Sequence, residues 1–274
     1  MPTITIDTVR CTSCGTCIAV CPLRVLHFDA ENMPVYIPGG DDRCIICGHC
    51  EAVCPSEALD LADQRLQPDH YSDGGFPVAK ELLATQVRMR RSIRQFNEQP
   101  VPRSSIEELL EVVRFAPTGT NSQQLHWLII YNRQELLRLT GFVVDWMRHL
   151  IATDHPLTTR FNLAGMIKAF EKGNDPICRN APHLVLVHAD ASRPVNQVDG
   201  IIALTQFDLL APSFGIGCCW GGFFQYACEG WPPLRDALGL PASHRTIYAM
   251  MIGTPVLRFQ RPPKRNHASV SWIA

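Results

Sequence analysis

Eight of the twelve cysteines in this 274-residue sequence fall in one short stretch, in two copies of the same pattern. The pattern is Cys-x2-Cys-x2-Cys-x3-Cys-Pro, and the second copy follows the first at a constant offset of 33 residues. A thiolate at every third residue lets one loop bind three corners of an iron–sulfur cube, while the cysteine before proline binds the other cluster. The spacing therefore predicts two [4Fe–4S] clusters, one held by Cys11, Cys14, Cys17 and Cys54, the other by Cys44, Cys47, Cys50 and Cys21.

Two other uses of clustered cysteines fit this pattern less well. Structural zinc sites usually take two separated Cys-x2-Cys pairs instead of triplets followed by Cys-Pro. A disulfide framework is typical of exported proteins, and the N-terminal sequence MPTITIDTVR has no evident signal peptide. The stretch resembles a bacterial two-cluster ferredoxin over residues 1–66. The remaining cysteines lack this spacing and are expected to be buried, unreactive thiols: Cys178, Cys218, Cys219 and Cys228.

A second group of reactive side chains begins after residue 89. Arg90, Arg91, Ser92 and Arg94 lie within five residues of one another. Guanidinium groups match phosphate oxygens in geometry, and a serine hydroxyl adds a hydrogen bond, so the run suits an anionic ligand. Taken alone, such a run is more often a solvated surface.

Three further segments share polar, glycine-rich or basic character. The loop at 116–123 (APTGTNSQ) offers hydroxyls and amides that suit a polar ring edge, although it would also serve as a simple turn. The stretch at 215–223 (GIGCCWGGF) is rich in glycine, which lets a backbone approach a flat ring closely or build a core turn. Near the C-terminus, Lys264 and Arg265 follow a Gly-Thr-Pro strand end.

These segments, in this order over residues 86–274, resemble the nitroreductase family of flavoproteins. The resemblance implies FMN as cofactor and an obligate homodimer with FMN at the subunit interface, because the 116–123 loop of this family reaches the flavin of the partner subunit. It assigns the phosphate and the flavin pyrimidine to the arginine run and the basic tail, and the flavin ring to backbone near the second glycine-rich stretch. The residues carried over are Arg90, Arg91, Ser92, Arg94, Pro117, Thr118, Gly119, Asn121, Cys219, Trp220, Gly221, Gly222, Lys264 and Arg265.

The whole chain resembles ferredoxin-fused nitroreductases, which implies a function. Clusters carry single electrons, and a flavin accepts one or two and can pass on a hydride equivalent. A low-potential donor, either reduced ferredoxin or flavodoxin or NAD(P)H, would supply electrons through the clusters to FMN, which would reduce a nitro compound, quinone or activated alkene. Two alternatives remain: a flavin dehydrogenase or dehalogenase that sends electrons outward, and a redox carrier without catalytic activity. No side chain stands out as a catalytic acid or base.

The two resemblances imply an α+β protein. We expect a small ferredoxin-like domain at 1–66, a linker or covering segment at 67–85, and an FMN-binding domain at 86–274 with a mixed, mainly antiparallel sheet wrapped by helices. Apolar spacing predicts helices at 79–89 and 198–210, strands at 127–131 and 184–188, and a helix after Pro102 capped by Ser104 or Ser105. The segment at 140–175 matches no motif, and the resemblance to the nitroreductase family implies that it builds the substrate lid. Its large residues, such as Trp146 and Met147, are expected to serve mainly in helix packing.

Composition excludes several classes of protein. Residues 1–66 carry four basic and nine acidic side chains, whereas residues 67–274 carry 21 and 17, so the net charge is only −1. Nucleic-acid binding is not expected, because it requires a basic excess. No run of 18 apolar residues indicates a membrane span, and a cytoplasmic location is the default expectation.

Overall fold

The computed structural model describes residues 3–62 and 78–273, which divide into two compact units. The first unit falls within residues 1–76 and also includes Thr118–Ser122, and the second takes up the rest of the chain. Of the linker expected at 67–85, residues 67–77 lie outside the described residues, and residues 80–85 are helical. The predicted domain boundaries therefore stay predictions.

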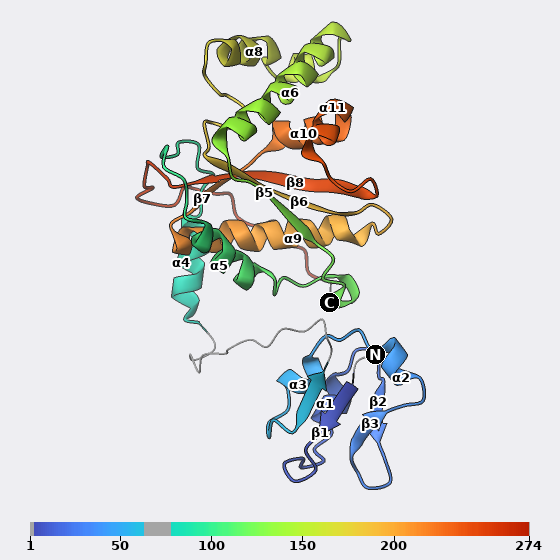
Figure 1. Cartoon of the computed structure of the whole chain (residues 1–274). Helices are drawn as coiled ribbons and strands as arrows, with labels where there is room; N and C mark the ends of the chain where they lie inside the picture. The colour runs from blue at the N-terminus through green and yellow to red at the C-terminus, as the bar shows by residue number, and fades with distance from the viewer. Residues whose placement is uncertain (1–2, 63–77, 274) are drawn as a thin grey trace. The chain divides into compact units, whose positions relative to one another are not determined.

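The first unit consists of two short antiparallel ribbons and three short helices (Figure 1). Strand β1 (Thr3–Ile6) pairs with β4 (Leu59–Ala62), and β2 (Leu26–Phe28) pairs with β3 (Pro34–Tyr36). The helices are α1 (Thr16–Val20), α2 (Gly40–Arg43) and α3 (His49–Ala52). The helices α1 and α3 begin inside the two cysteine repeats, which places both repeats in equivalent local structure.

The internal repeat is visible in the backbone as well as in the sequence. Gly15 and Gly48, which lie 33 residues apart, both precede a helix in the left-handed conformation, at φ of 72° and 70°. Glycine adopts this conformation without the steric cost that other residues meet. Two further pairs at the same offset have positive φ despite carrying side chains: Ser13 with Ile46, and Arg24 with Glu57. Both cysteine loops therefore follow the same backbone path, with positive φ at equivalent positions.

The second unit is built on a four-stranded sheet with the strand order β5-β6-β8-β7. The strands are β5 (His126–Ile130), β6 (His183–Asp190), β7 (Gly217–Trp220) and β8 (His244–Gly253), and all their pairings are antiparallel. The two central strands, β6 and β8, are buried along most of their length, as continuous apolar strands covered on both faces require. The α+β fold class predicted from the sequence is confirmed.

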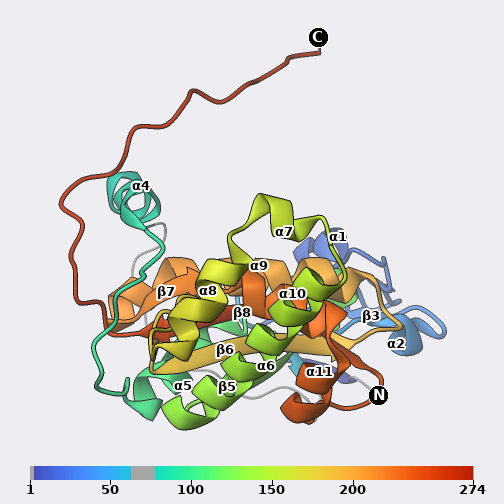
Figure 2. The ribbon, with the colours of Figure 1, turned by 90° about the horizontal axis from the view of Figure 1, so that it is seen from above.

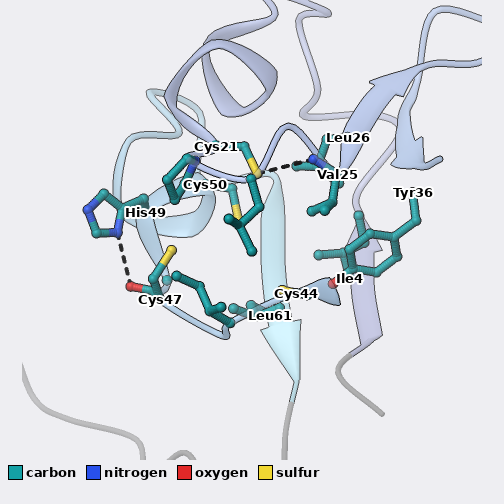
Figure 3. Close-up of a pocket in the computed structure, with 14 residues that line it drawn as sticks. Ile4, Cys21, Val25, Leu26, Tyr36, Cys44, Cys47, His49, Cys50 and Leu61 are labelled. Carbon is teal, nitrogen blue, oxygen red and sulfur yellow. Dashed lines mark hydrogen bonds between the residues drawn. The ribbon is translucent and has the colours of Figure 1, made fainter. Parts of the chain in front are cut away.

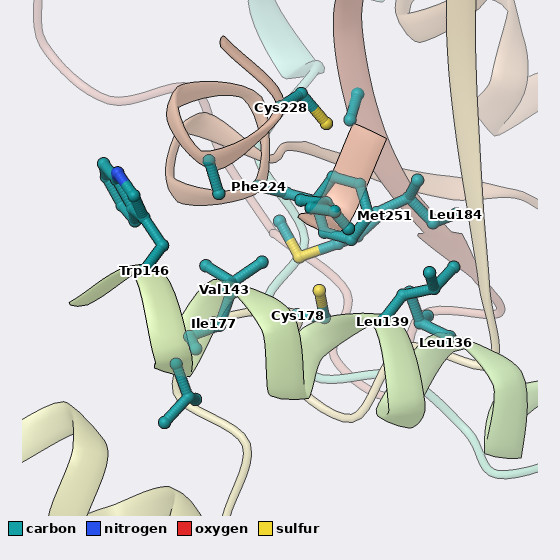
Figure 4. Close-up of a cluster of buried hydrophobic side chains, with 14 of the residues drawn as sticks. Leu136, Leu139, Val143, Trp146, Ile177, Cys178, Leu184, Phe224, Cys228 and Met251 are labelled. Atoms are coloured by element: carbon teal, nitrogen blue, oxygen red, sulfur yellow. The ribbon is translucent and has the colours of Figure 1, made fainter. Parts of the chain in front are cut away.

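Helices cover both faces of this sheet (Figures 1 and 2). Helices α5 (Arg103–Val113) and α9 (Val195–Leu210) pack on one face, where Phe207 and Leu109 are fully buried. On the other face lie α6 (Arg133–Ala152), α10 (Gly222–Gly230) and α11 (Pro232–Leu238). Figure 4 shows part of the buried cluster on this face, where side chains of α6 and α10 meet those of β6 and β8. The remaining elements are α4 (Lys80–Met89), α7 (Leu157–Arg160), α8 (Leu163–Glu171) and the 3-10 turns Gly119–Asn121 and Ala211–Phe214.

Most expected elements are present, and one detail of the prediction is wrong. Helix α5 begins after Pro102, and no side chain caps its N-terminus, so neither Ser104 nor Ser105 has the expected role. Proline fits this position because its fixed φ suits a helix start. In the segment at 140–175, Trp146 and Met147 are 4% and 0% exposed within the core. None of the described helices combines the length and hydropathy that a membrane span requires.

Candidate functional site

One cavity of the first unit is lined by four thiols from both cysteine repeats (Figure 3). Its volume is about 390 Å³ including its open mouth, and its lining includes Cys21, Cys44, Cys47 and Cys50. Apolar side chains from β1, β2 and β4 complete the enclosure, among them Ile4, Leu26 and Leu61. We call this the distal cavity, after the later repeat that supplies three of its cysteines.

The other four cysteines line a second cavity of the same unit. This proximal cavity, of about 340 Å³ including the open space at its mouth, is lined by Cys11, Cys14, Cys17 and Cys54. Each cavity thus draws three thiols from one repeat and the Cys-Pro thiol from the other. The structure brings the eight cysteines together in the grouping that their spacing predicts.

The surroundings of these thiols fit an iron–sulfur cluster. Backbone N–H groups of Val25 and Ala58, equivalent positions in the repeat, donate to Cys21 Sγ at 3.5 Å and to Cys54 Sγ at 3.2 Å. Burial, with smaller contributions from neighbouring thiols, raises the pKa of Cys50 to about 11. A coordinated cation is what turns such thiols into thiolates.

The donor geometry also suits a cube more than a single ion. Among the described residues, no three His, Cys, Asp or Glu side chains surround a site for one metal ion. The four thiolates that hold a cubane each bind a different iron, so their sulfur atoms need not converge on one point. The cavities and their donors are therefore compatible with the two clusters inferred from the spacing.

In the second unit, the arginine run is held against the sheet edge by backbone hydrogen bonds. Ile93 N–H donates to the Cys218 carbonyl on β7 at 2.8 Å, and Asn97 N–H donates to the Thr254 carbonyl after β8 at 2.8 Å. Gly217 permits this close approach, since a Cβ there would lie 2.6 Å from the Ile93 side chain. The sheet edge thereby carries the run of arginines next to the glycine-rich stretch.

Arg90 forms a polar network around a buried carboxylate with two residues distant in sequence. Its Nη1 lies 3.1 Å from Asp208 Oδ2 on α9, and Trp220 Nε1 donates to the same oxygen at 3.0 Å. The Asp208 side chain is only 7% exposed, and burial raises its pKa, whereas the bonds from Trp220 and Arg90 oppose that rise. Asp208 therefore orients two residues that the sequence assigned to the flavin site.

Arg91 offers an unsatisfied donor. Its Nη2 donates to the Arg88 carbonyl at 2.7 Å, but its Nε is buried and has no hydrogen-bond partner. Burial, together with the positive charges of Arg265 and Arg90, lowers the pKa of Arg91. A buried donor without a partner, held beside other positive charges, is favourable only where an acceptor such as an anion joins it. The arrangement fits the phosphate of FMN at this position.

The glycine-rich stretch forms β7 and the start of α10. Cys219 is 5% exposed, and burial raises the pKa of its thiol, while the charges of Arg94 and Arg179 act in the opposite direction. Gly221 N–H donates to the Ala249 carbonyl at 2.8 Å, and a Cβ at Gly221 would lie 3.2 Å from that oxygen. The arginine run, the Trp220 indole and the closely packed backbone at Gly221 therefore lie at the same edge of the sheet, beside β7.

The remaining predicted flavin residues lie outside the network of Arg90, Asp208 and Trp220. Ser92 and Gly222 are partly exposed, and Lys264 and Arg265 lie on the exposed C-terminal tail. Thr118, Gly119 and Asn121 belong to the first unit, where the Asn121 amide donates to the carbonyls of Ile45 and Ile46 at 3.1 and 2.8 Å. Pro117 is exposed and belongs to the second unit. The predicted flavin roles of all these residues stay predictions.

Sequence reasoning missed three residues that the geometry singles out. Asp208 had a weak signal, as an acid inside an otherwise apolar helical stretch. Arg179 has φ of 58° in the Arg-Asn-Ala-Pro segment, and its charge acts on Cys219. Tyr36 lines the distal cavity, but nothing in its sequence context indicates that position.

Comparison with known proteins gives consistent results for both units. A model described as "Nitroreductase family" matches residues 87–254, and one described as "4Fe-4S dicluster domain" matches residues 3–68. A relative from Archaeoglobus fulgidus, named "Putative NADH dehydrogenase/NAD(P)H nitroreductase", is 25% identical over 180 residues, covering 64% of this chain and 86% of that protein.

Two solved structures share the fold. A nitroreductase with bound FMN from Desulfitobacterium hafniense has a TM-score of 0.57 at 17% identity and covers 70% of this chain and 98% of its own. A nitroreductase with bound FMN from Bacteroides fragilis has a TM-score of 0.54 at 21% identity, with coverage of 69% and 98%. At these identities the likeness concerns the fold alone.

Proposed function

The chain belongs to the nitroreductase family and carries a 4Fe-4S dicluster domain, and from this premise we propose a specific electron route. Electrons from a low-potential donor enter two [4Fe–4S] clusters, pass to FMN, and reduce a small organic acceptor. The observation that carries this proposal is the division of eight cysteines into two cavities of four thiols each, in a chain whose second unit gathers arginines at one sheet edge.

The proposed cofactor set follows from the chemistry of each site. The distal cavity holds one cluster through Cys21, Cys44, Cys47 and Cys50, and the proximal cavity holds the other through Cys11, Cys14, Cys17 and Cys54. FMN, when bound, exchanges single electrons with clusters and two electrons with organic acceptors. The chain's own part is to bind these groups, keep them apart from water and orient the acceptor.

The residues around the arginine run have distinct tasks in this proposal. Arg91 and Arg265 bind the FMN phosphate, because two adjacent guanidinium groups with an unsatisfied buried donor match a dianion. Arg90 keeps its ion pair with Asp208 and thereby fixes Trp220 beside the ring site. The backbone from Cys219 to Gly222 faces the ring, and Arg94 and Lys264 complete the positive surroundings.

The proposed donor and acceptor are defined by chemical class. The donor is reduced ferredoxin, flavodoxin or NAD(P)H in the cytoplasm, where cluster thiols stay reduced. The acceptor is a nitro compound, a quinone or an activated alkene. A quinone, for example, takes up two electrons and two protons and leaves as the hydroquinone.

The proposal includes a homodimer. Helix α4 exposes Leu82, Leu83 and Val87 to 68%, 53% and 53%, and the C-terminal tail exposes Val270 and Trp272 to 61% and 91%. Apolar helix faces and extended tails of this kind are usually covered by another chain. The loop at 117–121 would contribute to the flavin site of the partner subunit.

Anaerobic purification followed by assays of iron, sulfide and FMN tests the cofactors. About eight irons and one FMN per chain are expected for two cubane clusters and one flavin. Clusters without flavin would contradict the proposal and favour a simple electron carrier. Steady-state assays in both directions then test the route: reduction of acceptors by reduced ferredoxin supports it, whereas electron delivery only from an organic substrate to an external oxidant would favour the outward-flowing dehydrogenase.

A further inference from the structure

The hydroxyl of Tyr36 is buried without a partner. Tyr36 is the last residue of β3, and its register partner on β2 is Leu26. The hydroxyl oxygen is inaccessible to solvent and has no hydrogen-bond partner among the described residues. Leaving a buried hydroxyl unsatisfied costs about 1–3 kcal/mol, so native proteins rarely do so without a reason.

The hydroxyl points into the distal cavity, toward Cys44 (Figure 3). The lining on the strand side is apolar, and the side chains of Ile4, Val25 and Leu61 cannot accept a hydrogen bond. Burial raises the pKa of Tyr36, and the nearby Cys44 thiol adds to that rise as a hydrogen-bonding neighbour, although no hydrogen bond of regular geometry joins the two side chains. The side-chain acceptors closest to this hydroxyl are therefore sulfur atoms, those of the cysteines or of the group that the cysteines hold.

The two cavities differ in the hydroxyl groups they offer. In the proximal cavity, Thr16 Oγ1 lies 3.2 Å from Cys14 Sγ, and Ser56 Oγ lies 3.7 Å from Cys54 Sγ. The repeat-equivalent positions in the distal half are His49 and Leu23, which have no hydroxyl. Among the described residues that line the distal cavity, Tyr36 is the one with a hydroxyl. The proximal cavity is thus lined by three aliphatic hydroxyls, those of Thr12, Thr16 and Ser56, whereas the distal cavity has one phenol.

We propose that the Tyr36 hydroxyl donates a hydrogen bond to sulfur in the distal cluster site and raises the reduction potential of the cluster bound there. The inference rests on the proposed function, because it requires a cluster in that cavity. Reduction adds negative charge to a cluster and its sulfur ligands, and a hydrogen bond to sulfur stabilises that charge. Through this hydrogen bond Tyr36 gives the two chemically similar cluster sites different reduction potentials.

The test is a redox titration of the anaerobic holoprotein, followed by electron paramagnetic resonance. The variant Tyr36→Phe removes only the hydroxyl. We expect one of the two midpoint potentials to fall, with a loss of about tenfold in the equilibrium constant for reduction, or about 59 mV for a one-electron couple. The other midpoint should remain at its wild-type value.

Two matched variants assign the effect. Thr16→Val removes the hydroxyl beside Cys14 and should lower the midpoint potential that Tyr36→Phe leaves unchanged. Tyr131→Phe removes a phenol that donates to the Val101 carbonyl in the second unit, and both midpoints should stay at their wild-type values. If Tyr36→Phe left both potentials unchanged at full iron content, or lowered both equally, the proposal would be overturned.

A second measurement keeps the inference testable if Tyr36→Phe does not assemble its clusters. Site-specific replacement of Tyr36 by 3-fluorotyrosine keeps the ring and makes the hydroxyl a stronger donor, so the same midpoint should rise. An unchanged midpoint would contradict the hydrogen bond. Iron content distinguishes failure of the proposed function from failure of the role given to Tyr36. Fewer than about eight irons in the wild-type chain would contradict the two-cluster function. Full iron content with unchanged midpoint potentials in the Tyr36 variants would contradict only the role of Tyr36.

Discussion

The two units of this chain are stabilised in different ways. The first unit has two-stranded ribbons and few buried apolar side chains, and its interior is lined largely by cysteines. The second has a four-stranded sheet with a fully buried apolar cluster on each face. Small domains bury too little surface to be stable alone and often depend on metal centres. The first unit should therefore need its cofactors to fold, whereas the second should not.

Removing iron should produce the largest difference in stability between the two units. An anaerobic chelator that extracts iron should unfold the first unit, because eight thiols then line cavities with nothing to bind. Hydrogen exchange should show loss of protection in β1 and β4, while amides in β6 of the second unit keep theirs. Continued protection of β1 and β4 in the iron-free chain would mean that the first unit folds without metal.

A substitution in the apolar core should destabilise the second unit and leave the first unit unaffected. Leu186→Ala, at a fully buried position of β6, should destabilise the second unit by about 2–5 kcal/mol. Urea unfolding of the second unit measures the loss, and iron content should stay at its wild-type value. Leu137→Ala on the exposed face of α6 is the matched control and should change stability by less than about 0.5 kcal/mol. An equal effect of both variants would contradict the assigned core.

The flavin site of the second unit is tested by Arg91→Ala. Loss of a hydrogen bond to a charged phosphate should weaken FMN binding by about 1.5–3 kcal/mol, roughly 10- to 150-fold in Kd. Fluorescence titration of the flavin-free protein measures this. Arg138→Ala, which removes an exposed arginine paired with Glu135, should bind FMN normally. Unchanged affinity in Arg91→Ala would mean that the phosphate lies elsewhere.

The free energy of unfolding of the second unit should also depend on pH, and this effect is expected to be smaller. His188 is 8% exposed and forms a cluster with His126 and His244, and its Nδ1 lies 2.9 Å from Nδ1 of His244. Burial, then the charges of His244 and His126, lower the pKa of His188 to about 4. The neutral ring therefore stabilises the fold above pH 6.5, and this stability is lost as the pH falls toward 4.

Urea unfolding at pH 7.0 and 5.5 measures this dependence. The wild-type second unit should lose about 1 kcal/mol more than His188→Gln does. The exposed His155, replaced by Gln, should leave the wild-type pH dependence in place. Equal pH dependence in wild type and His188→Gln would show that the histidine cluster does not carry it.

Much of the architecture could be predicted because its signals are local. The helix expected at 198–210 is the longer α9, and the apolar strand expected at 184–188 lies inside β6. Helix α4 agrees with its prediction within one residue. The capping of α5 by Ser104 or Ser105 was wrong because proline can open a helix equally well, and local sequence does not choose between the two.

The sequence alone determined which cysteines belong together and which family the second unit resembles. Ligand spacing and motif order are properties of short segments, so they are readable without coordinates. Only the tertiary structure decided that Asp208 holds Arg90 and Trp220, that Asn121 donates to the carbonyls of Ile45 and Ile46, and that the Tyr36 hydroxyl points at sulfur. These contacts join residues far apart in the chain, and they depend on strand register and helix packing, which no local pattern encodes.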